Sequence, residues 1–442
     1  MFASRPTKDL LASLVLLCLI CIAQFDILHA ISDDVSGPRQ FIAVNESKLL
    51  YSSFQCIGGS QVMDTNSMKQ SSVTVFPLNE AAHRTCLFRN VCFLKGELTF
   101  FSRYNKTMDH VQVPKEYQPK GFNGNVFHVA YLRAFTLPIK TITGAVPDGI
   151  RFSKVDLTFL DANSWSFNYG HYLIDNVIPA FMAAKLFNLP FSGSQQLYET
   201  NCRLFSILEP AFADRLVTYN RSMGSYREAC LSKLDGMNNY FFDHPPRYLD
   251  QMQSESMCFR RLMTGHGSSY GLKSVDLSRA LFLRAFRDFV LTRLLSSGPA
   301  MPPQENLVLV GLRTVGSAGG RIVNELCEAS TQALERNRHF GRRYRVECFV
   351  PSDLSFEDEI RQVQRAKVVV SVHGTISYMV LFTRDGTQQI SIANPKELKE
   401  NQILLYATHF HTLYLTWDRI KELPGLLHHS LTLADEHHQQ QL

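Results

Sequence analysis

The pattern of apolar and polar positions changes near residue 150 of this 442-residue chain. Over residues 31–150, short apolar stretches are separated by Gly, Pro and Asn, and this pattern predicts a β-rich region of strands and turns. The strands expected in this region are Val73–Phe76, Cys92–Leu94, Leu98–Ser102 and Val126–Leu132.

A first α/β domain is expected over residues 151–298. Val155–Leu160 has the composition of a buried strand, and apolar residues at helical spacing predict a helix from about Gly170 to Phe187. Pro179 lies inside this helix and should kink it or shift its start. A second helix is expected after Ser278. Its apolar stripe consists of Phe282, Phe286, Phe289, Val290 and Leu294.

A second α/β domain is expected over residues 299–427, because predicted strands and helices alternate there. The strands are Leu307–Val310, Tyr344–Phe349, Lys367–Val372 and Gln388–Ile392, and the helices are Val323–Glu335, Phe356–Ala366 and about Ile376–Phe382. Such alternation predicts parallel βαβ units and an open, doubly wound sheet. Residues 428–442 are rich in His and Gln and are expected to form a frayed polar tail.

The N-terminus and the cysteines indicate the secretory pathway. Residues 1–30 contain the apolar run Leu10–Ala23, which is typical of a cleaved signal peptide or of an uncleaved signal anchor, and both interpretations stay open. Three N-x-[ST] sequons make Asn45, Asn105 and Asn220 candidate glycosylation sites. Eight cysteines lie outside the apolar run without a C-x-x-C spacing, so we expect most of them to form disulfides.

Composition and charge exclude two broad classes of protein. Hydrophobic residues make up 45% of the chain, which is too many for a mainly disordered protein. The 45 basic and 40 acidic residues leave a net charge of +5, which is too small and too evenly spread to indicate nucleic-acid binding. A modestly basic cleft for an anionic small molecule stays compatible with this charge.

The first candidate binding residues stand just after a predicted strand, where open α/β sheets bind their ligands. His373 and Gly374 follow Lys367–Val372. Glycine lets backbone N–H groups approach a phosphate, the next helix adds donors and partial positive charge, and the histidine can bond to a phosphate or ribose oxygen. The alternative is a tight turn with a histidine bonded inside the protein.

Two arginines flank a glycine-rich loop that follows the strand Leu307–Val310. Arg313 and Arg321 can clamp a pyrophosphate with paired hydrogen bonds, while the loop matches neither the P-loop nor the dinucleotide fingerprint. Asn324 and Glu325 open the next predicted helix, where Glu325 has the alternative role of a favourable charge at the helix N-terminus.

A candidate acid–base pair lies on the helix expected after Val155–Leu160. His171 and Asp175 are four residues apart and so share one helix face, which makes either of them a candidate general base. The alternative is a surface contact. The sequence contains no D-x-D and no H-E-x-x-H, so it shows neither of these two metal-site patterns.

Four blocks in this order resemble glycosyltransferase family 61, over about residues 86–395. The second block matches the family's N-x-G-H-x-x-x-D-x-x-x-P, the third its R…R-x-x-x-N-E, and the fourth its stretch ending in H-G-A-G-L-T-N-x-L-F. The blocks are Cys86–Cys92, Asn168–Pro179, Arg313 with Arg321–Glu325, and Phe356–Phe382.

The resemblance implies a GT-B fold, in which two Rossmann-like domains face a cleft, here with the β-rich region as an N-terminal extension. It implies an inverting transfer of a sugar, xylose or N-acetylglucosamine, from a UDP-sugar to a glycan or glycoprotein acceptor in the Golgi or endoplasmic reticulum, without metal or cofactor. A signal anchor would make the chain a single-pass type II membrane protein. By resemblance, the catalytic candidates are His171 and Asp175. The nucleotide-sugar-binding candidates are Arg313, Arg321, Asn324, Glu325, His373, Gly374 and Thr375.

Three positions depart from the family pattern. Ile376 stands where the family has its second glycine, Met379 where it has asparagine, and Ser391 where it usually has glutamate. These departures leave a second hypothesis open, that of a catalytically inactive, transferase-derived binding or scaffold protein.

Overall fold

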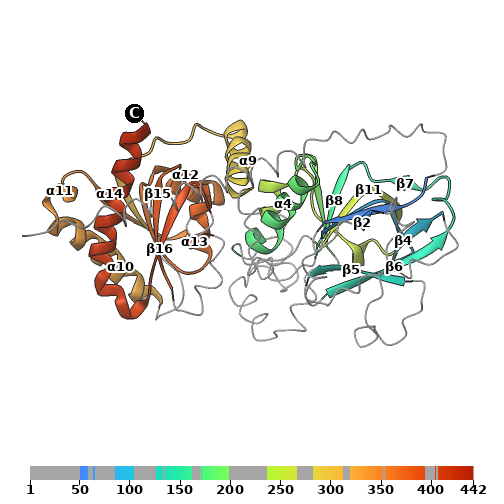
Figure 1. Cartoon of the computed structure of the whole chain (residues 1–442), viewed down its shortest axis with the longest axis horizontal. Helices are drawn as coiled ribbons and strands as arrows, with labels where there is room; N and C mark the ends of the chain where they lie inside the picture. Colours follow the sequence, from blue (N-terminus) through green and yellow to red (C-terminus); the bar gives the residue numbers. More distant parts are fainter. Residues whose placement is uncertain are drawn as a thin grey trace, which may run out of the picture. The chain divides into compact units, whose positions relative to one another are not determined.

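The computed structural model describes residues 50–57, 63–64, 85–103, 126–132, 135–161, 170, 172–198, 236–265, 282–311, 319–351, 354–393, 404 and 407–441 (Figure 1). The chain divides into two compact units, Met1–Leu49 and Leu50–Leu442, and all of these residues lie in the second. The apolar N-terminal run, the strand expected at Val73–Phe76 and the sequons at Asn45, Asn105 and Asn220 fall outside the described residues.

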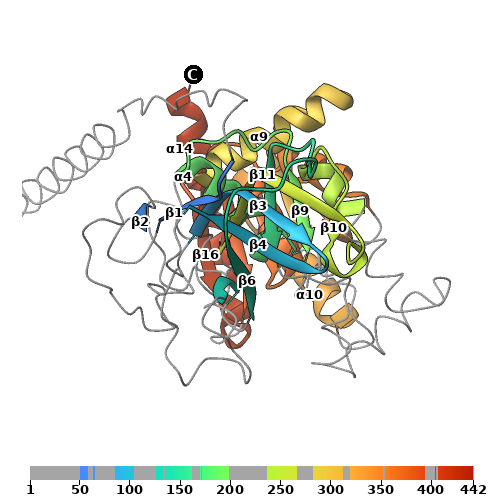
Figure 2. The same cartoon turned by 90° about the vertical axis from the view of Figure 1, so that its right-hand side faces the viewer.

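An 11-stranded sheet is formed by residues before 265. Its strands are β1 (Ser53–Ile57), β2 (Met63–Asp64), β3 (Thr85–Leu94), β4 (Glu97–Ser102), β5 (Val126–Leu132), β6 (Phe135–Thr143), β7 (Arg151–Phe152), β8 (Leu157–Asp161), β9 (Gln195–Tyr198), β10 (Arg247–Tyr248) and β11 (Ser256–Thr264). The order β10-β9-β8-β11 is parallel throughout, and numbered along the chain it is the 3-2-1-4 order of a Rossmann-like half. Figure 2 shows β11, β3 and β4 side by side in the continuation of this sheet.

The pairing of β3 with β11 corrects the boundary that the sequence predicts at residue 150. β3 belongs to the expected β-rich region and β11 to the expected α/β domain, yet the two strands pair antiparallel and share the disulfide Cys92–Cys258. One sheet therefore crosses residue 150, and the β-rich region is not a separate extension. Pairing between strands so distant in sequence leaves no local pattern from which it could be predicted.

The helix expected over residues 170–187 has two parts. Residues Tyr172–Val177 form the π-helix η3, and Ile178–Leu186 form the α-helix α4, with Pro179 in its first turn. An N–H group in the first helical turn has no acceptor inside the helix, so proline costs little there. Pro179 therefore marks the start of the α-helix, one of the two outcomes expected for it.

The second sheet consists of five parallel strands in the order β13-β12-β14-β15-β16. The strands are β12 (Leu307–Gly311), β13 (Arg345–Phe349), β14 (Val368–Val372), β15 (Thr387–Ile392) and β16 (Phe410–Leu415). The helices around it are α10 (Gly319–Arg336), α11 (Arg338–Gly341), α12 (Phe356–Arg365), α13 (Thr375–Tyr378), the 3-10 helix η8 (Met379–Phe382), the 3-10 helix η11 (Trp417–Glu422) and α14 (Leu423–Gln441).

Alternate residues of these strands face two different helix layers. Val308 and Val370 belong to an apolar cluster with residues of α10 and α14, and Leu309 and Val369 belong to another with residues of α12, α13 and η8. Figure 1 shows these two pairs of helices on opposite sides of the strands. Both faces are thus covered, as the apolar run at Lys367–Val372 predicts.

The frayed polar tail expected from residue 428 is wrong. Residues 428–441 lie in α14, and Ser430 and Leu431 are fully buried. Asp435 accepts a hydrogen bond from the Tyr344 hydroxyl and pairs with Lys367, whose Nζ lies 3.5 Å from its carboxylate. The buried positions of α14 recur about every three or four residues, which is the spacing of one helix face. The many His and Gln residues between them make the segment look like a polar tail.

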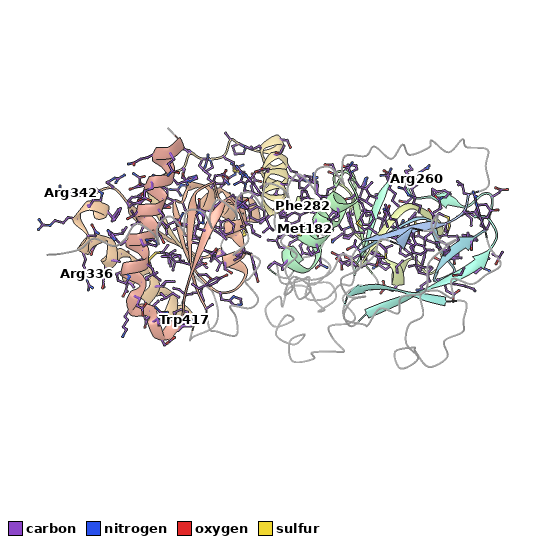
Figure 3. The ribbon with its side chains drawn as sticks, in the orientation of Figure 1. Met182, Arg260, Phe282, Arg336, Arg342 and Trp417 are labelled. Atoms are coloured by element: carbon purple, nitrogen blue, oxygen red, sulfur yellow. A yellow bond between two sulfur atoms is a disulfide. The ribbon has the colours of Figure 1, made fainter. Side chains whose placement is uncertain are left out.

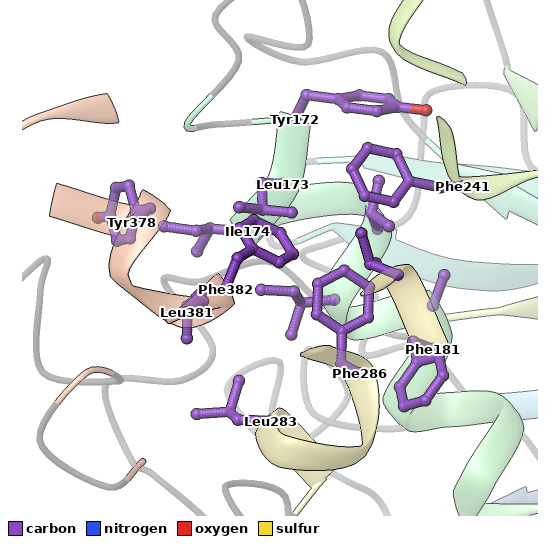
Figure 4. Close-up of a cluster of buried hydrophobic side chains, with 14 of the residues drawn as sticks. Tyr172, Leu173, Ile174, Phe181, Phe241, Leu283, Phe286, Tyr378, Leu381 and Phe382 are labelled. Atoms are coloured by element: carbon purple, nitrogen blue, oxygen red, sulfur yellow. The ribbon is translucent and has the colours of Figure 1, made fainter. Parts of the chain in front are cut away.

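One apolar cluster draws members from the helices of both sheets. Helix α9 (Phe282–Ser297) lies between the two sheets in sequence, and the Phe286 ring centroid is 5.3 Å from that of Phe181, 6.1 Å from that of Phe241 and 6.1 Å from that of Phe382. Figure 4 shows these rings together, and Figure 3 labels Phe282, which packs against the same cluster. The apolar stripe predicted for α9 therefore packs against helices of both sheets.

The cysteines follow the expectation where the structure describes them. Besides Cys92–Cys258, a disulfide joins Cys327 of α10 to Cys348 of β13, and Cys86 is also disulfide-bonded. Cys202 and Cys230 lie outside the described residues.

Candidate functional site

The second sheet has a topological switch point between β12 and β14. Its strand order, numbered along the chain, is 2-1-3-4-5, and sheets of this kind bind ligands beyond the carboxyl ends of their strands where that order reverses. β12 ends at Gly311, and β14 ends directly before His373 and Gly374. The turn that the sequence singles out therefore stands at the switch point.

Residues at the last or next-to-last position of the five strands pair in one row across the sheet, and small side chains stand in its middle. Phe349 pairs with Gly311, Gly311 with Ser371, Ser371 with Ser391, and Ser391 with Tyr414. Phe349 and Tyr414 close the two ends of this row, and burial raises the pKa of the Tyr414 hydroxyl. Between them, glycine and two serines leave the strand ends short of side-chain bulk.

Hydrogen bonds connect this row to α13. Gln389 Nε2 lies 3.3 Å from Ser371 Oγ and 3.0 Å from the Ser377 carbonyl, and Thr412 Oγ1 donates to Gln389 Oε1 at 2.9 Å. Ser391 is fully buried, and its Oγ has no hydrogen-bond partner in the described part of the chain. The site thus holds a buried hydroxyl with unused bonding capacity.

The His373-Gly374 turn is tight, but the helix after it is shorter than expected. The His373 N–H donates to the Ile392 carbonyl at 2.7 Å, and the residue is buried. Gly374 has φ +131°, and within the part of the chain that the structure describes no atom lies within 4 Å of the place where its Cβ would stand. α13 contains four residues and continues as the 3-10 helix η8, so an N-terminal dipole is a weaker argument here than the sequence indicates.

The other candidates on this side are placed only in part. Arg313 lies outside the described residues, and Arg321, Asn324 and Thr375 lie on described helices while their side chains are outside the description. Glu325 is exposed on α10. α10 begins at Gly319, so the alternative that Glu325 stabilises the N-terminus of this helix is wrong.

Of the candidate acid–base pair, only the backbone of Asp175 is described. His171 is outside the described residues, and Asp175 lies on η3, with its side chain outside the description. π-Helical turns inside α-helices occur often at functional sites. Two buried contacts hold η3 against the strands: Asn176 Nδ2 donates to Asp161 Oδ2 at 2.6 Å, and the Tyr172 hydroxyl donates to Gln196 Oε1 at 3.0 Å.

Sequence reasoning missed two carboxyl groups, one of them fully buried and the other half-buried. Asp161 is the last residue of β8 and is fully buried, and its position after an apolar strand is the signal that could have found it. Glu359 lies in the first half of α12. Burial raises the pKa of Glu359 to about 8, and its Oε2 has no hydrogen-bond partner among the described residues. The sequence shows Glu359 only as one of three acidic residues in a first helical turn.

The described residues contain neither a cluster of metal-binding side chains nor a membrane-spanning helix. No group of three or more His, Cys, Asp or Glu side chains among them is arranged to hold a metal ion. None of the helices described is long and apolar enough to cross a membrane.

Comparison with solved structures returns glycosyltransferases. The E. coli heptosyltransferase WaaC with ADP is 13% identical, with 63% of this chain and 99% of that chain covered and a TM-score of 0.30. The glycotransferase of kitacinnamycin is 9% identical, with 63% and 93% covered and a TM-score of 0.24. No curated protein matches the chain.

Comparison with protein families gives one match, to the model described as Glycosyltransferase 61, over residues 169–390. These residues make up half of the chain and run from just before η3, beside the first sheet, into β15 of the second sheet. The chain therefore belongs to glycosyltransferase family 61 and is a glycosyltransferase.

Proposed function

We propose that this chain is an inverting glycosyltransferase of GT-B type that moves xylose or N-acetylglucosamine from a UDP-sugar to a glycan or glycoprotein acceptor in the secretory pathway. The observation that carries the donor side is the pair of serines Ser371 and Ser391 beside the switch point of the second sheet, next to the turn at Gly374, where no described atom lies within 4 Å of a Cβ position. Small side chains at such a point leave room for a nucleotide against the strand ends.

On the donor side, the diphosphate is bound by Arg313, Arg321 and the backbone at His373-Gly374-Thr375, with Asn324 and Glu325 contributing from α10. Guanidinium groups and backbone N–H groups stabilise the charge that develops on the leaving diphosphate. This set of groups supplies the stabilisation without a metal ion or cofactor, and the absence of a D-x-D pattern from the sequence agrees with this proposal.

On the acceptor side, His171 and Asp175 face the reacting sugar, and one of them removes the proton from the acceptor hydroxyl. The hydrogen bonds of Asn176 and Tyr172 to the first sheet support this role, because they fix the helical turn that carries Asp175. A base is effective only when its geometry is held by neighbouring contacts.

The first test measures the melting temperature of the protein with UDP, GDP, CMP and NAD, each with and without EDTA. A ligand at 100 times its Kd should add about 2.7 kcal/mol of apparent stability. We expect a rise with UDP alone that survives EDTA. If no nucleotide raises the melting temperature, the proposed donor class is wrong.

The second test replaces Arg313 by alanine and measures UDP affinity by calorimetry. The loss of one charge-assisted hydrogen bond should weaken binding by about 1.5–3 kcal/mol. Replacement of Arg336, which is exposed on the last turn of α10 far along the helix from its N-terminus, is the matched control and should leave UDP binding unchanged. Unchanged binding in the Arg313→Ala variant would remove Arg313 from the site.

A further inference from the structure

The side chain of Ile376 lies directly on the end of β12. A Cβ atom placed on Gly311 would be 2.4 Å from Ile376 Cγ1, 3.0 Å from Ile376 Cδ1 and 3.5 Å from Phe349 Cε1. Ile376 is buried, with 4% of its surface exposed. The space that the missing side chain of Gly311 leaves at the switch point is therefore filled by an apolar group from α13.

The other arm of the switch point is open. At Gly374, which follows the end of β14 by two residues, no atom of the described residues lies within 4 Å of the position a Cβ would take. The two glycines thus have opposite surroundings, although both stand at the carboxyl ends of the strands that define the switch point. A nucleotide that approaches this edge finds free space at Gly374 and the Ile376 side chain at Gly311.

Backbone and side-chain contacts fasten α13, and with it Ile376, in this position. The Ser377 N–H lies 3.0 Å and the Ser377 Oγ 2.7 Å from the Gly374 carbonyl, and the Ser377 carbonyl accepts the bond from Gln389 of β15. Tyr378 and Phe382, which follow in the same segment, join the shared apolar cluster (Figure 4). Ile376 therefore cannot leave Gly311 without breaking contacts that reach into the sheet.

We propose that Ile376 limits the access of the nucleotide donor to the switch point: its side chain excludes the donor from Gly311 and confines it to the Gly374 arm. This inference rests on the proposed function, because it concerns the same donor site. It gives the departure from the family pattern at this position a physical consequence, since a glycine here would leave the end of β12 uncovered.

The test measures the Kd for UDP by calorimetry on the full chain and on the variant Ile376→Ala. Removal of the three carbon atoms beyond Cβ should lower the Kd at least about tenfold, because a single methylene in a pocket already changes binding by about that factor. Ile376→Val, which removes one methylene, should shift the Kd in the same direction by less and serves if the alanine variant does not fold. Ile360→Ala removes an equally buried isoleucine of the same apolar cluster and should leave the Kd unchanged.

A second substitution closes the thermodynamic cycle. Gly311→Ala in the Ile376→Ala background puts a methyl group back into the opened space, so the Kd should return to within about twofold of the original value and part of the lost stability should be recovered. No other change in the site is needed for this reversal.

The outcomes separate this inference from the proposed function. If the original chain binds UDP and Ile376→Ala binds it no more tightly, the inference is wrong and the donor proposal stands. If only Ile376→Ala binds UDP, the inference holds and the original chain does not use a UDP donor. If neither binds UDP, both are overturned.

Discussion

The two sheets differ at the edges toward which their parallel strands point. At the edge of the first sheet, β8 ends in the buried Asp161, whose carboxylate accepts a 2.6 Å hydrogen bond from Asn176. At the edge of the second sheet, the row through Gly311, Ser371 and Ser391 carries no carboxylate at all. Both edges are buried, but the first contains the carboxyl group of Asp161, and the second contains the small side chains of Ser371 and Ser391.

This difference teaches which chemistry each edge can perform. A nucleoside diphosphate is anionic, and a carboxylate buried at the strand ends would repel it strongly, whereas Glu325 of α10 is exposed to solvent, which screens its charge. Proton removal from an acceptor hydroxyl needs a basic group held in place by its neighbours. The second edge therefore suits the donor and the first edge suits the acceptor and its base, which is the division that the proposed function requires.

The largest expected effect comes from the replacement of Phe286, whose ring contacts a helix beside each of the two sheets. Phe286→Ala removes ring contacts to Phe181 and Phe382 together, and a fully buried phenylalanine truncated to alanine costs about 3–5 kcal/mol of unfolding free energy. Hydrogen exchange should show that amides of both sheets lose protection.

Phe340→Ala is the matched control for this experiment. Phe340 is buried in the cluster between the second sheet, α10 and α14, so its loss should reduce protection mainly in the second sheet. If Phe286→Ala reduces protection in only one sheet, the shared cluster does not couple the two regions.

The second effect concerns the buried carboxyl group beside the second sheet. Burial raises the pKa of Glu359 to about 8 in the folded protein, whereas in the unfolded chain the carboxyl ionises near pH 4.5. Between these two values the unfolded chain releases a proton that the folded protein keeps, so folding stability falls as pH rises from about 4.5 to about 8. Glu359→Gln should abolish this loss and stabilise the protein at pH 8 by about 2–4 kcal/mol.

Denaturant unfolding at pH 5 and at pH 8 measures this prediction. The variant and the original chain should have similar stability at pH 5 and diverge at pH 8. The control is Glu357→Gln. Glu357 lies in the same first turn of α12 and forms an ion pair with Arg361, so its replacement should not stabilise the protein at either pH. A Glu359→Gln variant that is less stable at pH 8 would contradict the prediction.

The smallest effect is expected for Asp161 at the first edge. Its replacement should lower the unfolding free energy, whereas Glu359→Gln should raise it. Asp161→Ala leaves the buried amide of Asn176 without its acceptor, which should cost about 1–3 kcal/mol of unfolding free energy. Asp161→Asn keeps an acceptor oxygen and should cost less. Thermal unfolding of the two variants at one pH gives the comparison, and a stabilising effect of Asp161→Ala would show that this carboxylate is not held as the first edge requires.

The second sheet was predictable because its signals are local. The strands β12 and β14 are short apolar runs. Ser355 before α12 accepts the hydrogen bond from the Asp358 N–H that an N-cap makes. The helix α10 starts four residues before the expected Val323, since Gly319 and Gly320 are poor helix formers and hide its first turn. α14 was missed because its apolar positions are few among His and Gln.

The first sheet was predictable only in pieces. Strands such as Leu98–Ser102 and Val126–Leu132 are where the sequence predicts them, but their union with β8 and β11 is not visible locally. The candidate His373-Gly374 was found from its place after a strand, whereas Ser391, Ile376 and Asp161 acquire their meaning from what lies beside them in space.

By itself, the sequence determined the main strands and helices between Leu307 and Ile392, that a turn with His373 and Gly374 follows β14, and that the chain resembles its family. These features follow from side-chain period and from motifs a few residues long, so they need no knowledge of distant contacts. Only the tertiary structure decided that one sheet crosses residue 150 and that Ile376 covers Gly311 while no described atom covers Gly374. It also decided that the carboxyl group of Asp161 accepts a hydrogen bond from Asn176, whereas Glu359 Oε2 has no partner among the described residues. Each of these depends on packing between segments far apart in sequence, and packing is set by the whole fold rather than by any local pattern.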